Sequence, residues 1–179
     1  ENGLDGWTLA HGPAASPIQA VSSYTYNGKT LAPRTGETFA RAEAGSGHTK
    51  ATRTLPSPQH GVFTGYINLL ENVNVGMIRV RTASHEYLVL ANSTAGRVSY
   101  RIDATETATP IAVSTETWHE VKIIAGPAGT EGYWDGTLLF RSPHAETVTQ
   151  ISFGSEWSSA PCGFDDFSFV PVTTVQGTV

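Results

Sequence analysis

Residues 118–140 decide the fold, and they read WHEVKIIAGPAGTEGYWDGTLLF. In the first part of this stretch, Val121 and Ile123 alternate with charged Glu120 and Lys122, which is the period-two pattern of a strand with one buried face. In the second part, the Asp-Gly dipeptide at 135–136 separates two apolar runs, and this is a strong short-range signal for a β-hairpin. The stretch therefore predicts antiparallel strands.

The same pattern continues in both directions along the chain. Short runs rich in Val, Ile, Thr, Tyr and Phe are bounded by Gly, Pro, Asn and Ser. Many strands with evenly spaced turns, and almost no helical periodicity, predict an all-β fold: an antiparallel β-sandwich of the jelly-roll type. Residues 10–34 contain three prolines and are predicted to form a long connection across one edge of the sandwich. The predicted strands are 38–44, 49–55, 61–70, 76–82, 86–91, 97–103, 118–125, 132–134, 137–141, 148–153 and 163–170.

Length and composition limit the domain organisation and the classes of partner. At 179 residues the chain can bury a self-sufficient core, and we predict one domain over residues 1–171 and a tail or linker start over 172–179. A net charge of −5 argues against nucleic acid as a partner. The apolar runs are far shorter than the ~20 residues of a membrane span. The single cysteine, Cys162, excludes an intramolecular disulfide and a cysteine-based zinc site. Nothing in the sequence indicates an oligomeric state.

Arginines on two predicted strands form the first candidate site. Arg79 and Arg81 are two residues apart and therefore share one face of their strand. If the neighbouring strands are adjacent in space, four side chains line one concave sheet as ligand-binding residues: Arg79, Arg81, Tyr87 and Arg101. Because the arginine fork matches a carboxylate, the ligand implied is an acidic polysaccharide such as a uronate. The alternative is a solvated sheet face on which the arginines pair with Glu86, Asp103 or Glu120.

An exposed aromatic ring is the second candidate. Aromatic rings stack on the apolar C–H faces of sugars, while polar side chains form hydrogen bonds with the hydroxyl groups. Trp157 lies in the polar loop 155–161, which has no burial periodicity, so we predict that it binds the ligand. The alternative is a ring that folds over the end of the sandwich.

Several phrases, in order along nearly the whole chain, resemble one structural family. Residues 1–7 (ENGLDGW) resemble the opening of secreted bacterial jelly-roll domains. The stretch 118–138 resembles the W-H-x-V-x-I … Y-x-D-G-x-L signature of laminin-G-like and concanavalin A-like domains, and residues 151–154 (ISFG) with 164–169 (FDDFSF) resemble their closing strands. The resemblance implies a secreted or surface-attached bacterial protein. Such domains occur as carbohydrate-binding modules, accessory domains of polysaccharide-degrading enzymes, adhesion domains and enzymes.

The resemblance also implies a structural calcium ion, held between the start of the chain and the closing acidic pair. Glu1 lies at the matching N-terminal position, and Asp165 and Asp166 form the pair, so these three residues are the predicted ligands. Calcium takes about six to eight oxygen ligands from carboxylates and carbonyl groups. The alternative is a solvated or capped acidic pair at the start of a strand.

Motifs for catalysis are mostly missing from the sequence. Neither the E-x-D-x-x-E strand of concanavalin A-like glucanases nor the R-x-E-x-R strand of jelly-roll alginate lyases is matched. A lyase needs a base and a group that neutralises charge, and His119 or His85 near Arg79 and Arg81 would supply both. We therefore expect a non-catalytic, lectin-like domain that binds a glycan. The alternatives are a polysaccharide lyase or hydrolase acting on an acidic glycan, and a structural or adhesion spacer.

Overall fold

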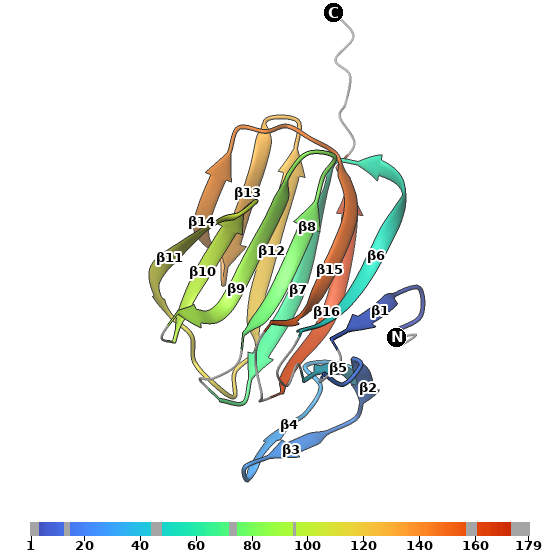
Figure 1. Cartoon of the computed structure of the whole chain (residues 1–179), viewed down its shortest axis with the longest axis vertical. Coiled ribbons are helices and arrows are strands. Elements are labelled where there is room, and N and C mark those ends of the chain that lie inside the picture. Colours follow the sequence, from blue (N-terminus) through green and yellow to red (C-terminus); the bar gives the residue numbers. More distant parts are fainter. Residues whose placement is uncertain are drawn as a thin grey trace, which may run out of the picture.

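The protein consists of two facing β-sheets. The computed structural model describes residues 4–12, 15–43, 48–71, 75–94, 96–156 and 161–172, and this part of the chain contains strands and turns but no helix. Accordingly, no helix within these ranges is long and apolar enough to cross a membrane. Two seven-stranded antiparallel sheets form the sandwich, which confirms the predicted all-β, jelly-roll fold (Figure 1).

Each sheet combines strands that are far apart in the sequence. Sheet A contains, in spatial order, β1 (Thr8–His11), β6 (His48–Gln59), β15 (Val148–Glu156), β8 (Gly76–Arg81), β9 (Glu86–Thr94), β10 (Arg97–Ile102) and β11 (Thr105–Ala112). Sheet B contains β14 (Thr137–Ser142), β13 (Gly129–Trp134), β12 (His119–Gly126), β7 (Gly61–Leu69), β16 (Cys162–Pro171), β5 (Phe39–Ala42) and β2 (Gln19–Val21). A separate hairpin of β3 (Tyr24–Tyr26) and β4 (Lys29–Leu31) lies beyond β5 and β2 in Figure 1.

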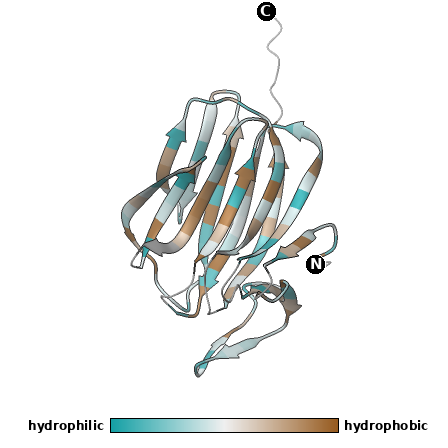
Figure 2. Cartoon of the chain, viewed as in Figure 1, coloured by the Kyte–Doolittle hydropathy of each residue, from teal (hydrophilic) through white to brown (hydrophobic). Residues whose placement is uncertain are grey.

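Alternation of side chains places the core between the sheets. In β12, Val121, Ile123 and Ala125 are fully buried, whereas Glu120 and Lys122 lie on the outer face. Figure 2 shows the resulting bands of hydrophobic and hydrophilic residues along the strands. Because both sheets contribute an inner face of this kind, one continuous hydrophobic core fills the space between them.

The Asp-Gly turn forms the predicted hairpin. Asp135 and Gly136 have φ values of 46° and 76°, the left-handed conformation that a tight hairpin turn requires. Trp134 and Thr137 pair on either side of the turn. The Asp135 carboxylate also accepts a hydrogen bond from the backbone N–H of Glu120 at 2.8 Å, which ties the turn to the neighbouring strand.

The structure differs from the predicted strands in two places. Residues 10–34 do not form a simple connection, because they contain β2, β3 and β4, and Leu31 at the end of β4 packs with Phe39 and Leu70 in a second small core. Residues 105–112 form β11 at the edge of sheet A. This strand is largely exposed and rich in threonine, so it lacks the buried apolar face that marks a strand in the sequence.

Candidate functional site

The predicted arginines lie on the outer face of sheet A, which points away from the core. β8, β9 and β10 are consecutive neighbours, so the predicted adjacency of these strands is present. Ser152 pairs with Arg79, and Arg101 lies in the same row two strands away. The Arg79 Nε donates to Ser152 Oγ at 2.8 Å. Arg81 lies in the next row, opposite Glu86.

Glutamates pair with these arginines. Glu86 Oε1 lies 2.7 Å from Arg81 Nη2 and 3.3 Å from Arg79 Nη1. On the next hairpin, Arg101 Nη2 lies 3.1 Å from Glu106 Oε2. The Arg79 side chain is 11% exposed, whereas that of Arg81 is 52% exposed. The pairing with Glu86 that a solvated sheet face predicts is therefore present, and we call Arg79, Arg81, Glu86, Arg101 and Glu106 the arginine face.

One end of the outer face is covered. Met77, Leu88 and Leu90 point away from the main core, yet they form a separate apolar cluster and are at most 3% exposed. The outer face of an antiparallel sheet is commonly solvated. A ligand therefore has access to the arginine face mainly at the end that contains half-exposed Arg81.

Beyond Arg81, the arginine face continues into a polar hollow of about 620 Å³. The hollow is lined by residues 81–86 together with Asp103 and Thr149. His85 lies here, with Nδ1 2.8 Å from Asp103 Oδ2, and its ring stacks on His144 at a centroid distance of 3.9 Å. The backbone N–H of Glu86 and then the His85 ring lower the pKa of Asp103 through their hydrogen bonds. The structure thus brings His85 to the accessible end of the arginine face.

His119 has a structural position. Its side chain is 9% exposed, Nδ1 lies 2.7 Å from Asp135 Oδ2, and its ring stacks on Trp134 at 4.7 Å. Nε2 lies 2.9 Å from the hydroxyl of Ser114. His119 belongs to β12 of sheet B, whereas the arginines lie on the outer face of sheet A. The prediction that His119 lies near the arginines as a base is therefore wrong.

Tyr87 also differs from its predicted position. It is fully buried, its ring lies nearly parallel to that of Phe140, and its hydroxyl lies 3.3 Å from Ser142 Oγ. Tyr87 pairs with Val80, an inward-facing residue, while Arg79 and Arg81 face outward. The predicted strand adjacency is correct, but this register places the ring in the core, where it cannot line the outer face.

The acidic pair of β16 is bound by the segment 34–35. Asp165 Oδ2 accepts hydrogen bonds from the backbone N–H groups of Arg34 at 2.8 Å and Thr35 at 3.4 Å. Asp166 accepts from the Arg34 guanidinium at 2.5 Å and from the Thr35 hydroxyl. Burial is the main cause that raises the pKa of Asp165. The pair therefore anchors β16 to the chain that precedes β5.

The surroundings of this pair do not by themselves form a calcium site. Calcium takes about six to eight oxygen ligands, whereas the described neighbours contribute N–H and O–H donors and a guanidinium cation. No group of three or more His, Cys, Asp or Glu side chains suited to a metal occurs among the described residues. Glu1 and Trp157 lie outside the described residues, so their predicted roles stay predictions. Thermal unfolding with calcium and with EDTA tests the ion: a lower Tm in EDTA would support it.

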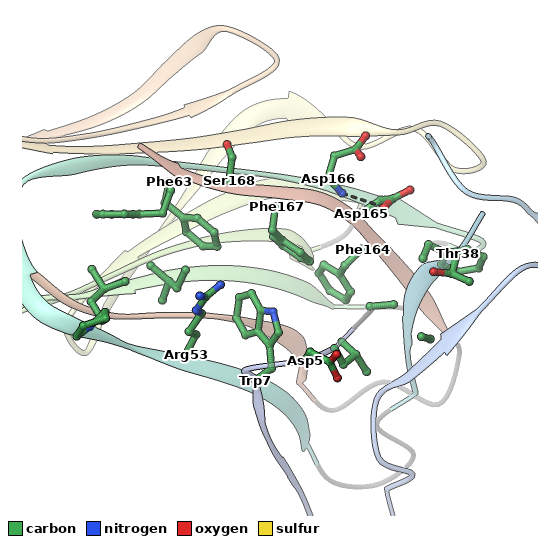
Figure 3. A pocket seen from close by; sticks show the side chains of 18 of the residues that line it. Asp5, Trp7, Thr38, Arg53, Phe63, Phe164, Asp165, Asp166, Phe167 and Ser168 are labelled. Atoms are coloured by element: carbon green, nitrogen blue, oxygen red, sulfur yellow. Dashed lines mark hydrogen bonds between the residues drawn. The ribbon is translucent and has the colours of Figure 1, made fainter. Parts of the chain in front are cut away.

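A second cavity lies between the sheets. A cleft of about 790 Å³ opens along the edge formed by β6 and β16 (Figure 3). Its lining includes five aromatic residues, Trp7, Phe63, Phe164, Phe167 and Phe169. Arg53 of β6 is also part of the lining. No motif in the sequence indicates the cleft, although alternation with Ala51 and Leu55 places Arg53 on the inward face of its strand.

Comparisons with known proteins identify the fold but no family. No family model and no curated protein match the chain. Among solved structures, a sialidase aligns with 93% of this chain at 12% identity and a TM-score of 0.62, and this chain spans 17% of its length. The carbohydrate-binding module CBM66 from Bacillus subtilis aligns over 92% of this chain and 95% of the module, at 12% identity and a TM-score of 0.57. An alginate lyase of polysaccharide lyase family 7 aligns over 95% of this chain and 96% of the lyase, at 12% identity and a TM-score of 0.62. At these identities the likeness establishes the concanavalin A-like jelly-roll fold alone.

Proposed function

We propose that the chain is a carbohydrate-binding domain that holds a polysaccharide, without cleaving it, on the arginine face. The main support is the fixed arrangement of Arg79, Arg81 and Glu86. Guanidinium groups present planar N–H donors and carboxylates present acceptors, and neighbouring sugar hydroxyls require both. The likeness in fold to a carbohydrate-binding module and to an alginate lyase supports a glycan as the ligand.

The position of Arg81 favours an acidic glycan. Its side chain is half exposed, and the contact with Glu86 involves only one of its guanidinium nitrogens. The remaining N–H donors can form a charge-assisted fork with the carboxylate of a uronate. Arg79, which is nearly buried and bonded to both Ser152 and Glu86, supports this arrangement from below.

Calorimetric titration with polysaccharides tests the proposal. We expect a uronate polymer to bind the native protein and Arg81→Gln to weaken the affinity by about tenfold, since one charge-assisted hydrogen bond is removed. Arg141→Gln is the matched control, because Arg141 is a 70% exposed arginine of sheet B that is also paired with a glutamate. Equal losses in both variants would contradict the proposed surface. If no neutral or acidic polysaccharide binds, the spacer alternative is favoured.

A lyase is the second candidate, and the position of His85 is the observation that favours it. His85 lies in the same hollow as Arg81, so a base and a group that neutralises charge meet at one end of sheet A. Cleavage of a uronate polymer by elimination produces an unsaturated sugar that absorbs in the ultraviolet. If the protein is a lyase, this absorbance appears and His85→Ala abolishes it. Binding without any such product supports the non-catalytic function.

We further propose that the protein acts outside the cell or on its surface. The support is indirect, because it follows from the proposed polysaccharide ligand and from the resemblance of residues 1–7 to secreted bacterial domains. An antibody raised against the domain tests the location on intact cells. Labelling only after the cells are permeabilised would contradict it.

A further inference from the structure

An arginine of β6 occupies an inward-facing position in the cleft between the sheets. Ala51 and Leu55 on either side of it pack against the main core, and Arg53 itself pairs with Ile151, which is 3% exposed. Charged residues at inward positions are generally paired. Among the described residues, however, Arg53 forms no hydrogen bond or ion pair, and its side chain extends into the open cleft (Figure 3).

Aromatic rings form the walls beside this arginine. In Figure 3, the Arg53 side chain lies next to Trp7 and points toward Phe63 and Phe167 of the opposite sheet. The Trp7 ring packs against Phe167 at a centroid distance of 5.5 Å and edge-on against Phe153 at 4.8 Å. These contacts fix the orientation of the rings, so the cleft offers a preformed apolar wall next to a cation.

A tight turn holds Trp7 in this place. The backbone N–H of Trp7 donates to the carbonyl of Leu4 at 3.1 Å, and Gly6 within the turn has a φ of 80°. The Arg53 guanidinium lies 4.0 Å from the position that a Cβ on Gly6 would occupy. The turn and the arginine are therefore neighbours, and together they form one side of the cleft.

The other charges of the cleft do not neutralise Arg53. Asp165 and Asp166 contribute to the lining, but their carboxylates bind Arg34 and Thr35, and Figure 3 shows them directed away from Arg53. Asp5 lies on the far side of Trp7 from Arg53 in the same view. Within the described lining, Arg53 is the only cation.

We propose that this cleft binds a small ligand that combines an aromatic or similarly apolar body with one anionic group. The guanidinium of Arg53 forms a forked interaction with a carboxylate, and the apolar body lies against Trp7 and Phe167. Apolar pockets that contain a few placed polar groups are typical sites for ligands of this class. The cleft lies between the sheets, apart from the arginine face, so this site goes beyond the proposed glycan function.

A pair of isosteric probes tests the proposal on the full chain. 2-Naphthoate carries an aromatic body and a carboxylate, and 2-naphthamide is its neutral counterpart. By calorimetric titration we expect the native protein to bind the naphthoate about tenfold more tightly than the naphthamide, because only the anion forms a charge-assisted interaction. Arg53→Gln should remove this preference, and Arg53→Lys, which keeps the charge but not the fork, should retain part of it.

Two controls distinguish binding in this cleft from binding elsewhere on the protein. Arg97→Gln changes an exposed arginine of β10 and should leave both affinities unchanged. Arg81→Gln should weaken the glycan but not the naphthoate, so the two proposals can fail independently. Equal binding of the two probes by the native protein, unchanged preference in Arg53→Gln, or no binding of either probe would overturn the proposal. Unchanged circular dichroism and Tm for Arg53→Gln would exclude unfolding as the cause of a loss.

Discussion

Replacing Glu86 with glutamine tests whether the arginine face depends on a shared carboxylate. Glu86→Gln keeps the size of the side chain but removes the charge that faces both Arg79 and Arg81. Exposed ion pairs contribute about 0–1 kcal/mol to stability, whereas removal of one partner from a buried pair costs about 3–5 kcal/mol. Arg79 is 11% exposed but retains its bond to Ser152, and Arg81 is 52% exposed. We therefore expect an intermediate loss of about 2 kcal/mol in the free energy of unfolding.

This loss is large enough to measure. For a domain of this size, 1 kcal/mol corresponds to a shift of about 2–4 °C, so Glu86→Gln should lower Tm by about 4–8 °C. Urea unfolding should show the same loss as a lower midpoint with an unchanged m-value. Glu131→Gln is the matched control, because it breaks an ion pair of Arg141, whose side chain is 70% exposed, and should change Tm much less. A Tm for Glu86→Gln equal to that of the control, or higher, would refute the reasoning.

The same variant reports on the ligand. In Glu86→Gln the guanidinium of Arg81 is no longer shared between an internal carboxylate and a bound uronate. The affinity for a uronate polymer should therefore increase, while that for a neutral polysaccharide should not. Weaker binding of the uronate polymer by a variant that is folded would show that Glu86 itself contacts the glycan.

Three further predictions concern pH, packing and the thiol. The lowered pKa of Asp103 means that its hydrogen bonds stabilise the fold above the ordinary pKa of 3.8 and are lost as the pH falls below it, so Asp103→Asn should flatten the fall of Tm between about pH 4 and pH 2. In Gly132→Ala the new Cβ would lie 2.1 Å from the Phe140 ring and should destabilise the fold by about 1–3 kcal/mol in urea unfolding, whereas Gly126→Ala, with its nearest atom at 3.7 Å, is the tolerated control. Burial raises the pKa of Cys162 to about 12, so Ellman's reagent should react with it only after unfolding; rapid reaction in the native state would contradict its burial.

Alternation along single strands was sufficient to predict the sandwich. The inward residues of β12 and the Asp-Gly turn after Trp134 have local signals, and both are found as predicted. The face on which Tyr87 lies has no such signal, because it depends on how β8 and β9 pair. The turn between Arg81 and Glu86 makes these two residues partners and thereby directs Tyr87 inward. One residue of register changes the face of every side chain in a strand.

The candidate sites show the same limit. The neighbourhood of Arg79, Arg81 and Arg101 was predictable, because strands close in sequence are commonly adjacent in a sheet. Arg53 was not, because its role depends on the space between β6 and β16, which are separated by most of the chain. β11 was missed for a different reason: its edge position leaves its threonines exposed, and the sequence then has no apolar alternation to indicate a strand.

The place of the last two strands bears on how the protein is made. β15 lies between β6 and β8, and β16 lies between β7 and β5, so the end of the chain fills the interior of each sheet. During synthesis, both sheets have a gap until these residues leave the ribosome, and the strands beside the gaps present unpaired backbone groups that can join another chain. Pairings between residues so distant in sequence also form slowly. A nascent chain without β15 and β16 is thus not a smaller stable domain but an aggregation-prone intermediate, and expression should benefit from chaperones or from slow synthesis at low temperature.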